Sequence, residues 1–166
     1  MKIDIAQAVK SEGEAFSKKH RGEFAAIEFI GETYEFPGGA SVECEWRYDG
    51  EGVIVTGRFD ADLKARCARC AEESVYTLGF DFAEYYKKQP EEGMYAYNGE
   101  TIDLSQMLED NVVINLPPRM LCDEGCEGLC SRCGKSLNEG ACSCTPLEEK
   151  NSPFSKLAEL YDDEEV

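Results

Sequence analysis

Eight of the nine cysteines in this sequence fall into four closely spaced pairs, and these pairs are the residues best suited to chemistry. They are Cys67 and Cys70, Cys122 and Cys126, Cys130 and Cys133, and Cys142 and Cys144. Structural zinc is usually held by four ligands, and short turns between two cysteines supply them two at a time. The sequence therefore predicts two four-thiolate zinc sites. Four protein ligands leave no position for a reactive water, so these sites indicate architecture and not metal-assisted hydrolysis.

The spacing leaves open how the four pairs combine. Eight residues, with a glycine near each end, separate the last two pairs. This length suits a self-contained zinc knuckle with the ligands Cys130, Cys133, Cys142 and Cys144. The other two pairs would then form a second site that joins a hairpin tip to a later segment, with the ligands Cys67, Cys70, Cys122 and Cys126. A cross-braced arrangement, in which the first pair combines with the third, satisfies the same spacing rules.

Two other cysteine chemistries compete with zinc. An iron–sulfur cluster also accepts four thiolates, and the cysteines from Cys122 to Cys133 superficially resemble a ferredoxin run. Cys67 and Cys70 have the spacing of a thioredoxin-type redox pair, but no strand-to-helix context follows Cys70. We therefore expect zinc and keep the iron–sulfur cluster as the less favoured alternative. The ninth cysteine, Cys44, alternates in register with Val42 and Trp46, so we expect it to be a buried core thiol.

Catalytic motifs are weak in this sequence. The only histidine, His20, stands in Lys18-Lys19-His20-Arg21, where we expect a solvated basic turn. A Cys-His or Ser-His mechanism would need that one residue. There is no glycine-rich phosphate loop with its lysine. The sequence therefore predicts a protein that is not an enzyme and has no small-molecule substrate.

The charge balance limits the partners. Seventeen Lys and Arg against 34 Asp and Glu give a net charge of -17. Such a surface repels phosphate backbones and attracts basic partners over about a Debye length, ~8–10 Å. The first ten residues contain no apolar leader, and nowhere do about 18 apolar residues run together. We therefore expect a cytoplasmic protein without membrane contact, where paired cysteines more often bind metal than form disulfides.

The few positive groups cluster on or beside the cysteine segments. They are Lys64, Arg66, Arg69, Arg119, Arg132 and Lys135. These residues are the candidates for any contact with RNA. They also have a simpler interpretation, since a zinc ion held by four thiolates carries a charge of about -2 that basic side chains would offset.

The elements that must position the cysteines are mainly strands. Apolar residues alternate with polar ones over residues 42–48, 53–67 and 76–82, which predicts antiparallel strands with Cys67 and Cys70 at or beside a hairpin tip. Residues 88–100 read as a surface loop. A helix is expected from the N-cap Asp103 to Pro117-Pro118, and a last short helix near Ser152-Pro153. Residues 119–145 show little periodicity, so metal would have to order them.

The expected fold class is α+β, an antiparallel β-sheet meander with a few short helices and a C-terminal cysteine-rich zinc-binding segment. Residues 1–118 would form the sheet core with one helix. Residues 119–166 would form the cysteine-rich segment and the last short helix, and we expect the two parts to make one compact unit.

Several short motifs follow one another in a specific order along most of the chain. They are Cys67-Ala-Arg-Cys70, Ile102-Asp-Leu before a helix, Leu116-Pro-Pro, Gly128-Leu-Cys-Ser-Arg-Cys-Gly134, Leu137-Asn-Glu-Gly140 and Asn151-Ser-Pro-Phe154. In this order they resemble the YceD family, a bacterial and plastid family named for accumulation of the large-subunit 23S ribosomal RNA. The resemblance implies a cytoplasmic, metal-binding protein that is needed for normal 23S rRNA levels and is a candidate for nucleic-acid binding.

The family resemblance also bears on the cysteines and on the partner. Members differ in how many downstream cysteines they keep, which favours joining the first pair to the Cys122 and Cys126 pair. Their genes tend to lie beside that of a small basic ribosomal protein of the large subunit. Two hypotheses follow: a protein-binding factor that holds a basic large-subunit ribosomal protein, and a direct 23S rRNA binder that uses the basic residues around the cysteines. The net charge favours the first.

Overall fold

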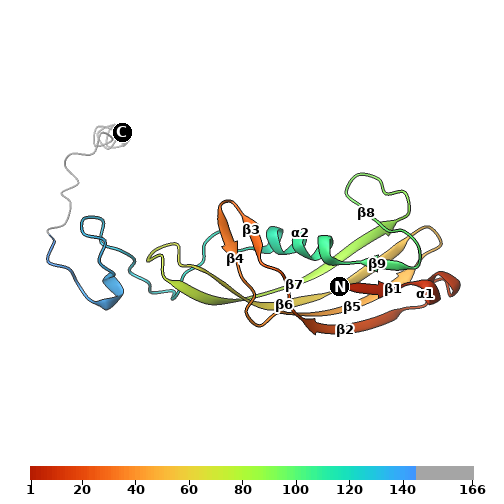
Figure 1. Ribbon diagram of the computed structural model, residues 1–166, viewed down its shortest axis with the longest axis horizontal. Helices are drawn as coiled ribbons and strands as arrows, with labels where there is room; N and C mark the ends of the chain where they lie inside the picture. Colours follow the sequence, from red (N-terminus) through yellow and green to blue (C-terminus); the bar gives the residue numbers. More distant parts are fainter. Residues whose placement is uncertain (145–166) are drawn as a thin grey trace, which may run out of the picture. The chain divides into compact units, whose positions relative to one another are not determined.

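The computed structural model describes residues 1–144, which form two compact units, Met1–Cys126 and the part of Glu127–Val166 that precedes residue 145. The first unit contains nine strands and two helices: β1 (Lys2–Asp4), α1 (Ala6–Lys10), β2 (Phe16–Gly22), β3 (Ile27–Phe29), β4 (Glu32–Tyr34), β5 (Ala40–Tyr48), β6 (Val53–Arg66), β7 (Glu73–Lys87), β8 (Tyr95–Ala96), β9 (Thr101–Asp103) and α2 (Ser105–Asn115). The described part of the second unit contains one 3-10 turn, η1 (Leu137–Glu139). Figure 1 shows these elements.

A five-stranded sheet with the order β2-β5-β6-β7-β8 is the frame of the first unit (Figure 1). Its long hairpin consists of β6, with 14 residues, and β7, with 15, paired antiparallel from Val53↔Tyr86 to Arg66↔Glu73. Both strands far exceed the usual 5–6 residues, so the hairpin extends beyond the other strands of the sheet. Cys67 and Cys70 lie in its connecting turn, as the alternation predicted.

One face of this sheet carries the hydrophobic core. Val42, Cys44 and Trp46 of β5 are buried, and the rings of Phe59 and Phe80 stack with centroids 4.9 Å apart. The buried apolar residues of α2 belong to the same core cluster: Met107, Leu108 and Val112. The other face holds charged ladders, in which Arg58 forms ion pairs with Asp60 and Asp81. This one-sided burial explains the alternating sequence.

The α+β class with mainly antiparallel strands is confirmed. The helix begins at Ser105, so its cap position is Leu104, one residue after the predicted cap Asp103. The Asp103 carboxylate nevertheless accepts a hydrogen bond from the Ser105 backbone N–H at 3.0 Å. It ends before Pro117, as expected. Among residues 1–144, no helix is long and apolar enough to cross a membrane. The helix predicted near Ser152 lies outside the described residues.

Two local predictions are wrong. Residues 18–21, expected as a basic turn, lie within β2, which pairs with β5 from Phe16↔Trp46 to Gly22↔Ala40. Their side chains are exposed as expected, but the backbone is extended because β5 supplies a partner strand. The predicted loop 88–100 also contains β8, whose two residues pair parallel to the end of β7.

A small hairpin, β3–β4, stands apart from the main sheet and turns at Ile30-Gly31 (Figure 1). Both turn residues have positive φ, 51° for Ile30 and 77° for Gly31, as a two-residue type I′ turn requires. Asn, Asp and Gly are the usual residues at the first position, and a β-branched side chain is strained there. Ile30 is also 84% exposed, so burial does not offset the strain.

Replacing Ile30 with Asn is expected to raise the free energy of unfolding by about 1 kcal/mol, because Asn adopts the left-handed conformation more readily. Urea unfolding of the metal-saturated protein, followed by the fluorescence of the single tryptophan Trp46, measures this change. Glu32→Asn is the matched control, since Glu32 follows the same turn in extended backbone and should give no gain. Equal stability of Ile30→Asn and wild type would contradict the strain.

Candidate metal centres

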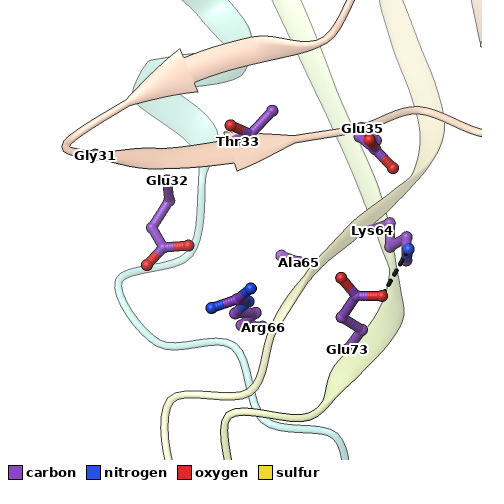
Figure 2. A pocket seen from close by; sticks show the side chains of 8 residues that line it. All are labelled: Gly31, Glu32, Thr33, Glu35, Lys64, Ala65, Arg66 and Glu73. Carbon is purple, nitrogen blue, oxygen red and sulfur yellow. Dashed lines mark ion pairs between the residues drawn. The ribbon is translucent and has the colours of Figure 1, made fainter.

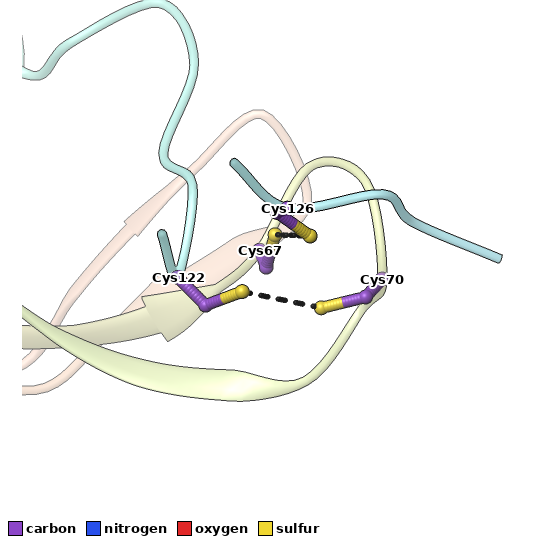
Figure 3. Close-up of side chains that lie close together, drawn as sticks. All are labelled: Cys67, Cys70, Cys122 and Cys126. Carbon is purple, nitrogen blue, oxygen red and sulfur yellow. Dashed lines mark hydrogen bonds between the residues drawn. The ribbon is translucent and has the colours of Figure 1, made fainter. Parts of the chain in front are cut away.

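Four cysteines from two distant segments meet at the tip of the β6–β7 hairpin. Cys67 follows the last residue of β6 and Cys70 closes the turn, while Cys122 and Cys126 lie in the segment after α2. Figure 3 shows Cys67 facing Cys126 and Cys70 facing Cys122. All but Cys122 are buried, and the partly buried Leu121 packs beside them. We call this group the first cluster.

The sulfur positions of the first cluster fit one tetrahedral metal ion. The Sγ atoms of Cys67 and Cys126 are 3.8 Å apart, those of Cys70 and Cys122 are 3.6 Å apart, and all four lie within 4.8 Å of one another. A tetrahedron with metal–sulfur bonds of ~2.3 Å has sulfur–sulfur edges of about 3.8 Å. A disulfide would instead need ~2.05 Å, and no disulfide joins any of the nine cysteines, all of which lie within residues 1–144. The first cluster could therefore hold a metal ion.

Cys130, Cys133, Cys142 and Cys144 form the second cluster, which lies entirely in the second unit. Their Sγ atoms also lie within 4.8 Å of one another, and those of Cys142 and Cys130 are 3.3 Å apart. Cys133 is exposed and the other three are partly buried. The structure thus has the separate-knuckle grouping and not the cross-braced one, and each group of four could hold one metal ion.

The same backbone turn presents the first two ligands of both clusters. In the first cluster, the N–H of Arg69 points to the Cys67 sulfur at 3.4 Å, Ala71 N–H donates to Cys67 O and Cys67 N–H donates to Glu72 O. In the second cluster the corresponding bonds join Arg132 to the Cys130 sulfur at 3.4 Å, Gly134 to Cys130 O and Cys130 to Lys135 O. The shared sequence signal is Cys-x-Arg-Cys.

The turns differ at the residue after the second cysteine. That residue has positive φ in both, 59° at Ala71 and 71° at Gly134. Glycine adopts this conformation freely, whereas alanine pays a steric penalty because of its Cβ atom. The first cluster therefore tolerates a local strain that the second cluster lacks.

Neighbouring groups pull the thiol pKa values in opposite directions within each cluster. Backbone N–H groups of Cys122 and Cys70 lower the pKa of Cys67 from 9.0 to about 6, while the sulfurs of Cys126 and Cys70 raise that of Cys122 to about 12. In the second cluster, the N–H groups of Cys133 and Arg132 lower the pKa of Cys130 to about 6, and the Cys133 sulfur raises that of Cys144 to about 12. Ionising all four thiols of a cluster would therefore need a cation, and binding a metal ion there would release protons.

Sequence reasoning missed several groups that hold the cysteine segments. Met120 accepts a hydrogen bond from Ala68 N–H at 2.8 Å, which ties the segment after α2 to the hairpin turn. In the second unit, the Asn138 side-chain oxygen accepts from Glu127 N–H at 2.7 Å. Asn138 could have been suspected, because Asn and Asp side chains commonly stabilise turns. The Met120 contact is through its carbonyl and has no sequence signal.

The six candidate RNA-binding residues are divided between the units: Lys64, Arg66, Arg69 and Arg119 in the first, Arg132 and Lys135 in the second. Lys64 forms an ion pair with Glu73 at 2.7 Å. The Arg69 guanidinium donates to the Cys126 carbonyl at 2.7 Å and so braces the first cluster. The side chains of Arg66, Arg119, Arg132 and Lys135 are exposed.

The remaining residues considered for reactivity, His20 and Cys44, lie on strands β2 and β5 of the main sheet. His20 is exposed on β2, and within residues 1–144 no hydrogen bond joins it to a serine or cysteine side chain. Cys44 is buried, as predicted, with its sulfur 3.6 Å from the carbonyl oxygen of Lys18. Burial raises the pKa of Cys44 to about 11, so this thiol stays protonated and poorly reactive at neutral pH.

The fold and the clusters define an α+β protein with two potential four-thiolate metal sites. The family model described as large ribosomal RNA subunit accumulation protein YceD matches residues 55–161. The chain belongs to this YceD family, which confirms the resemblance seen in its motifs.

The individual proteins that resemble this chain share between 29% and 36% identical residues with it. An uncharacterized protein of Mycobacterium tuberculosis (strain H37Rv) is 29% identical over 147 residues, covering 82% of this chain and 70% of that protein. An uncharacterized protein of Mycobacterium leprae is 35% identical over 109 residues, 60% of this chain and 50% of its own length. The chloroplastic large ribosomal RNA subunit accumulation protein YCED homolog 1 of Arabidopsis thaliana is 36% identical over 59 residues, 36% of this chain and 18% of its own length. No solved structure matches the chain.

Exchanging the residues after Cys70 and Cys133 tests the turn strain. Ala71→Gly is expected to raise the metal affinity of the first cluster about fivefold, and Gly134→Ala to lower that of the second by a similar factor, which corresponds to about 1 kcal/mol. Competition with a chromophoric chelator measures both. Ala68→Gly lies in the same turn without positive φ and should give no gain. An equal effect of Ala71→Gly and Ala68→Gly would contradict the strain.

Removing two ligands at a time tests whether the clusters are independent. Wild type should contain two metal ions, whereas Cys130→Ser/Cys133→Ser and Cys67→Ser/Cys70→Ser should each contain one. Because the second cluster lies outside the core, the first of these variants should keep the wild-type fluorescence of Trp46. Elemental analysis on the same samples gives the metal content, with Cys44→Ala as the control that keeps both ions. Loss of the Trp46 signal in Cys130→Ser/Cys133→Ser would refute independence.

Proposed function

We propose that this chain is a cytoplasmic, non-enzymatic zinc-binding factor that supports 23S rRNA accumulation and large ribosomal subunit biogenesis by binding a basic ribosomal protein. The description of its family and the name of the Arabidopsis relative both refer to accumulation of the large ribosomal RNA subunit. This shared description supports the ribosomal role.

We choose a basic protein as the partner because several of the basic side chains already form ion pairs with carboxylates of the same chain. Lys19 pairs with Glu43, Lys64 with Glu73 and Lys87 with Glu51, at distances of 3.1, 2.7 and 3.2 Å. Arg58 is shared between two aspartates. Even if every basic residue paired with one carboxylate, the 34 acidic residues would exceed the 17 basic ones by 17. Such a surface favours a basic protein over a polyanion.

Zinc is the metal that best suits both clusters. The sulfurs of each cluster lie close enough to share one ion. In a multi-iron cluster the ligand sulfurs bind different iron atoms and must stand further apart, which disfavours the iron–sulfur alternative. Four thiolates close the coordination shell of zinc, so its contribution would be to hold chain segments together. This supports a role in architecture and not in catalysis.

Direct binding of 23S rRNA is the competing function, and the contacts of two basic residues count against it. Lys64 is engaged by Glu73, and Arg69 is engaged by the Cys126 carbonyl beside the first cluster. Both therefore have structural roles that do not require RNA. Arg66 and Arg132 remain exposed and provide the cleaner test.

Making this chain more negative should weaken binding of 23S rRNA but not binding of a basic ribosomal protein. We expect purified basic large-subunit ribosomal proteins to bind more tightly than naked 23S rRNA fragments, with an affinity that falls as salt screens the attraction. Arg66→Glu/Arg132→Glu should leave protein binding unchanged or slightly tighter. Fluorescence anisotropy at several salt concentrations measures both partners. Arg21→Glu/Arg47→Glu is the charge-matched control, since it reverses two exposed arginines on β2 and β5, away from the cysteines. Tight rRNA binding that is lost in Arg66→Glu/Arg132→Glu would promote direct RNA binding instead.

A further inference from the structure

A cavity of about 300 Å³ separates the β3–β4 hairpin from the end of β6. Figure 2 shows its walls, with β4 on one side and β6 on the other. It is lined by Gly31, Glu32, Thr33, Glu35, Lys64, Ala65, Arg66 and Glu73. Five of these eight residues are charged, so the cavity is suited to a polar ligand more than to an apolar one. We call it the β4–β6 slot.

The slot begins next to a single bridge between the chain after β4 and strand β6. Beyond this bridge the two segments separate. Glu35 and Lys64 exchange two backbone hydrogen bonds, with Glu35 N–H to Lys64 O at 3.4 Å and Lys64 N–H to Glu35 O at 2.7 Å. Continued antiparallel pairing would place Thr33 opposite Arg66. That pair does not form, and the cavity lies between these two residues.

The backbones of Thr33 and Arg66 are directed into the slot. Within the β3–β4 hairpin, Phe29 and Glu32 flank the two-residue turn and form a hydrogen-bonded pair, so the next pair, Glu28↔Thr33, points its N–H and C=O groups outward. Arg66 lies two residues beyond Lys64 and therefore faces the same side of β6 as Lys64 does. The slot thus has one donor and one acceptor on each wall, as two open strand edges provide.

The side chains around the slot carry a small excess of negative charge. Lys64 and Glu73 neutralise each other at 2.7 Å. Glu32 and Glu35 make no ion pair within residues 1–144, and Arg66 is the one cation of the lining without such a pair in that range. A segment with Lys or Arg side chains would therefore find carboxylates at the slot.

The strained tip of the hairpin lies directly beside the slot, because Gly31, one of its lining residues, follows Ile30. Ile30 combines positive φ with 84% exposure, two features that do not favour the isolated fold. Strained residues of this kind cluster at functional sites such as ligand clamps. An apolar contact with a bound segment would account for an isoleucine at this position.

We propose that the β4–β6 slot binds an extended segment of the basic partner protein, which inserts as a strand between Thr33 and Arg66. This rests on the proposed function for the basic nature of the partner. Main-chain hydrogen bonds to the two open edges supply the register, Glu32 and Glu35 bind its basic side chains, and Ile30 contacts an apolar side chain. The slot is thus the specific docking site on a surface that otherwise attracts basic proteins without selection.

Proline substitution separates the slot from the rest of the hairpin. Thr33→Pro removes an N–H that faces the slot and not β3, so the β3–β4 ladder remains. Glu28→Pro is its matched control, because Glu28 is paired with Thr33 and its N–H points to the opposite edge of the hairpin. Thr33→Pro should weaken partner binding about five- to tenfold, whereas Glu28→Pro should change it less than twofold.

Charge reversals at Glu32 and Glu28, and a substitution of Ile30 at the hairpin turn, test the slot without proline. Glu32→Lys should weaken binding, while Glu28→Lys changes the same charge on the far edge of the hairpin and should have little effect. Ile30→Asn should bind about fivefold more weakly although it folds more stably. This combination cannot arise from loss of structure.

The experiment uses the full chain with its metal sites loaded, and two kinds of probe. These are the purified basic ribosomal proteins of the large subunit and labelled twelve-residue peptides tiled across their sequences. Affinities of all variants are compared by anisotropy. Hydrogen exchange should show protection of the Thr33 and Arg66 amides on binding, but not of the Glu28 amide.

Three outcomes are distinguishable. Selective loss of binding in Thr33→Pro, Glu32→Lys and Ile30→Asn, with exchange protection at the slot, supports the proposal. Wild-type binding that all three variants retain overturns the slot and leaves the proposed function intact. Wild type that binds none of the ribosomal proteins or peptides refutes the proposed function, and the slot proposal falls with it.

Discussion

Four sulfur atoms within 4.8 Å of one another at the hairpin tip can all be ionised only if a cation offsets their repulsion. The position of the segment after α2 depends on this, because outside the sulfurs it is tied to the turn by the bonds from Ala68 to Met120 and from Arg69 to Cys126. A metal ion in the first cluster would close the long loop from Cys70 to Cys122 and fix the end of β6. Arg66, which lines the β4–β6 slot, directly precedes Cys67. The shape of the slot would therefore depend on metal binding in the first cluster.

The parts of the fold with one buried face could be predicted because burial imposes a period of two on β5, β6 and β7. The cysteine pairs were visible because ligand spacing is local. Strand β2 was missed, since residues 18–21 are all polar on an edge that buries neither face. The β3–β4 turn lacks the Asn-Gly signal, as Ile30 occupies the first position. The grouping of the cysteines depends on which distant segment meets the β6–β7 turn, and the slot depends on the Glu35↔Lys64 bridge. No local sequence pattern contains either tertiary contact.

The two clusters use one turn in different surroundings. The first is largely buried and adjoins a sheet that orders its ligands in advance, so metal binding there would add less folding free energy per ion. The second has an exposed Cys133 and is held by short local bonds, such as Leu137 N–H to Gly128 O at 2.8 Å. Its ordering would depend more completely on the metal. Ala71 at positive φ is consistent with this difference, because a turn supported by the sheet tolerates strain that a small unit does not.

Net charge and local geometry answer different questions about a partner. A charge of -17 increases the rate of encounter with any basic protein and is screened by salt, so by itself it cannot distinguish one basic protein from another. Discrimination needs groups whose directions are fixed, and open strand edges meet that need since their N–H and C=O groups are spaced by the backbone. The excess of carboxylates over basic residues would then attract the partner, and the slot, whose lining has one more carboxylate than cations, would select its extended segment. The acidity of the whole chain and the near-neutrality of the slot are therefore compatible parts of one recognition mechanism.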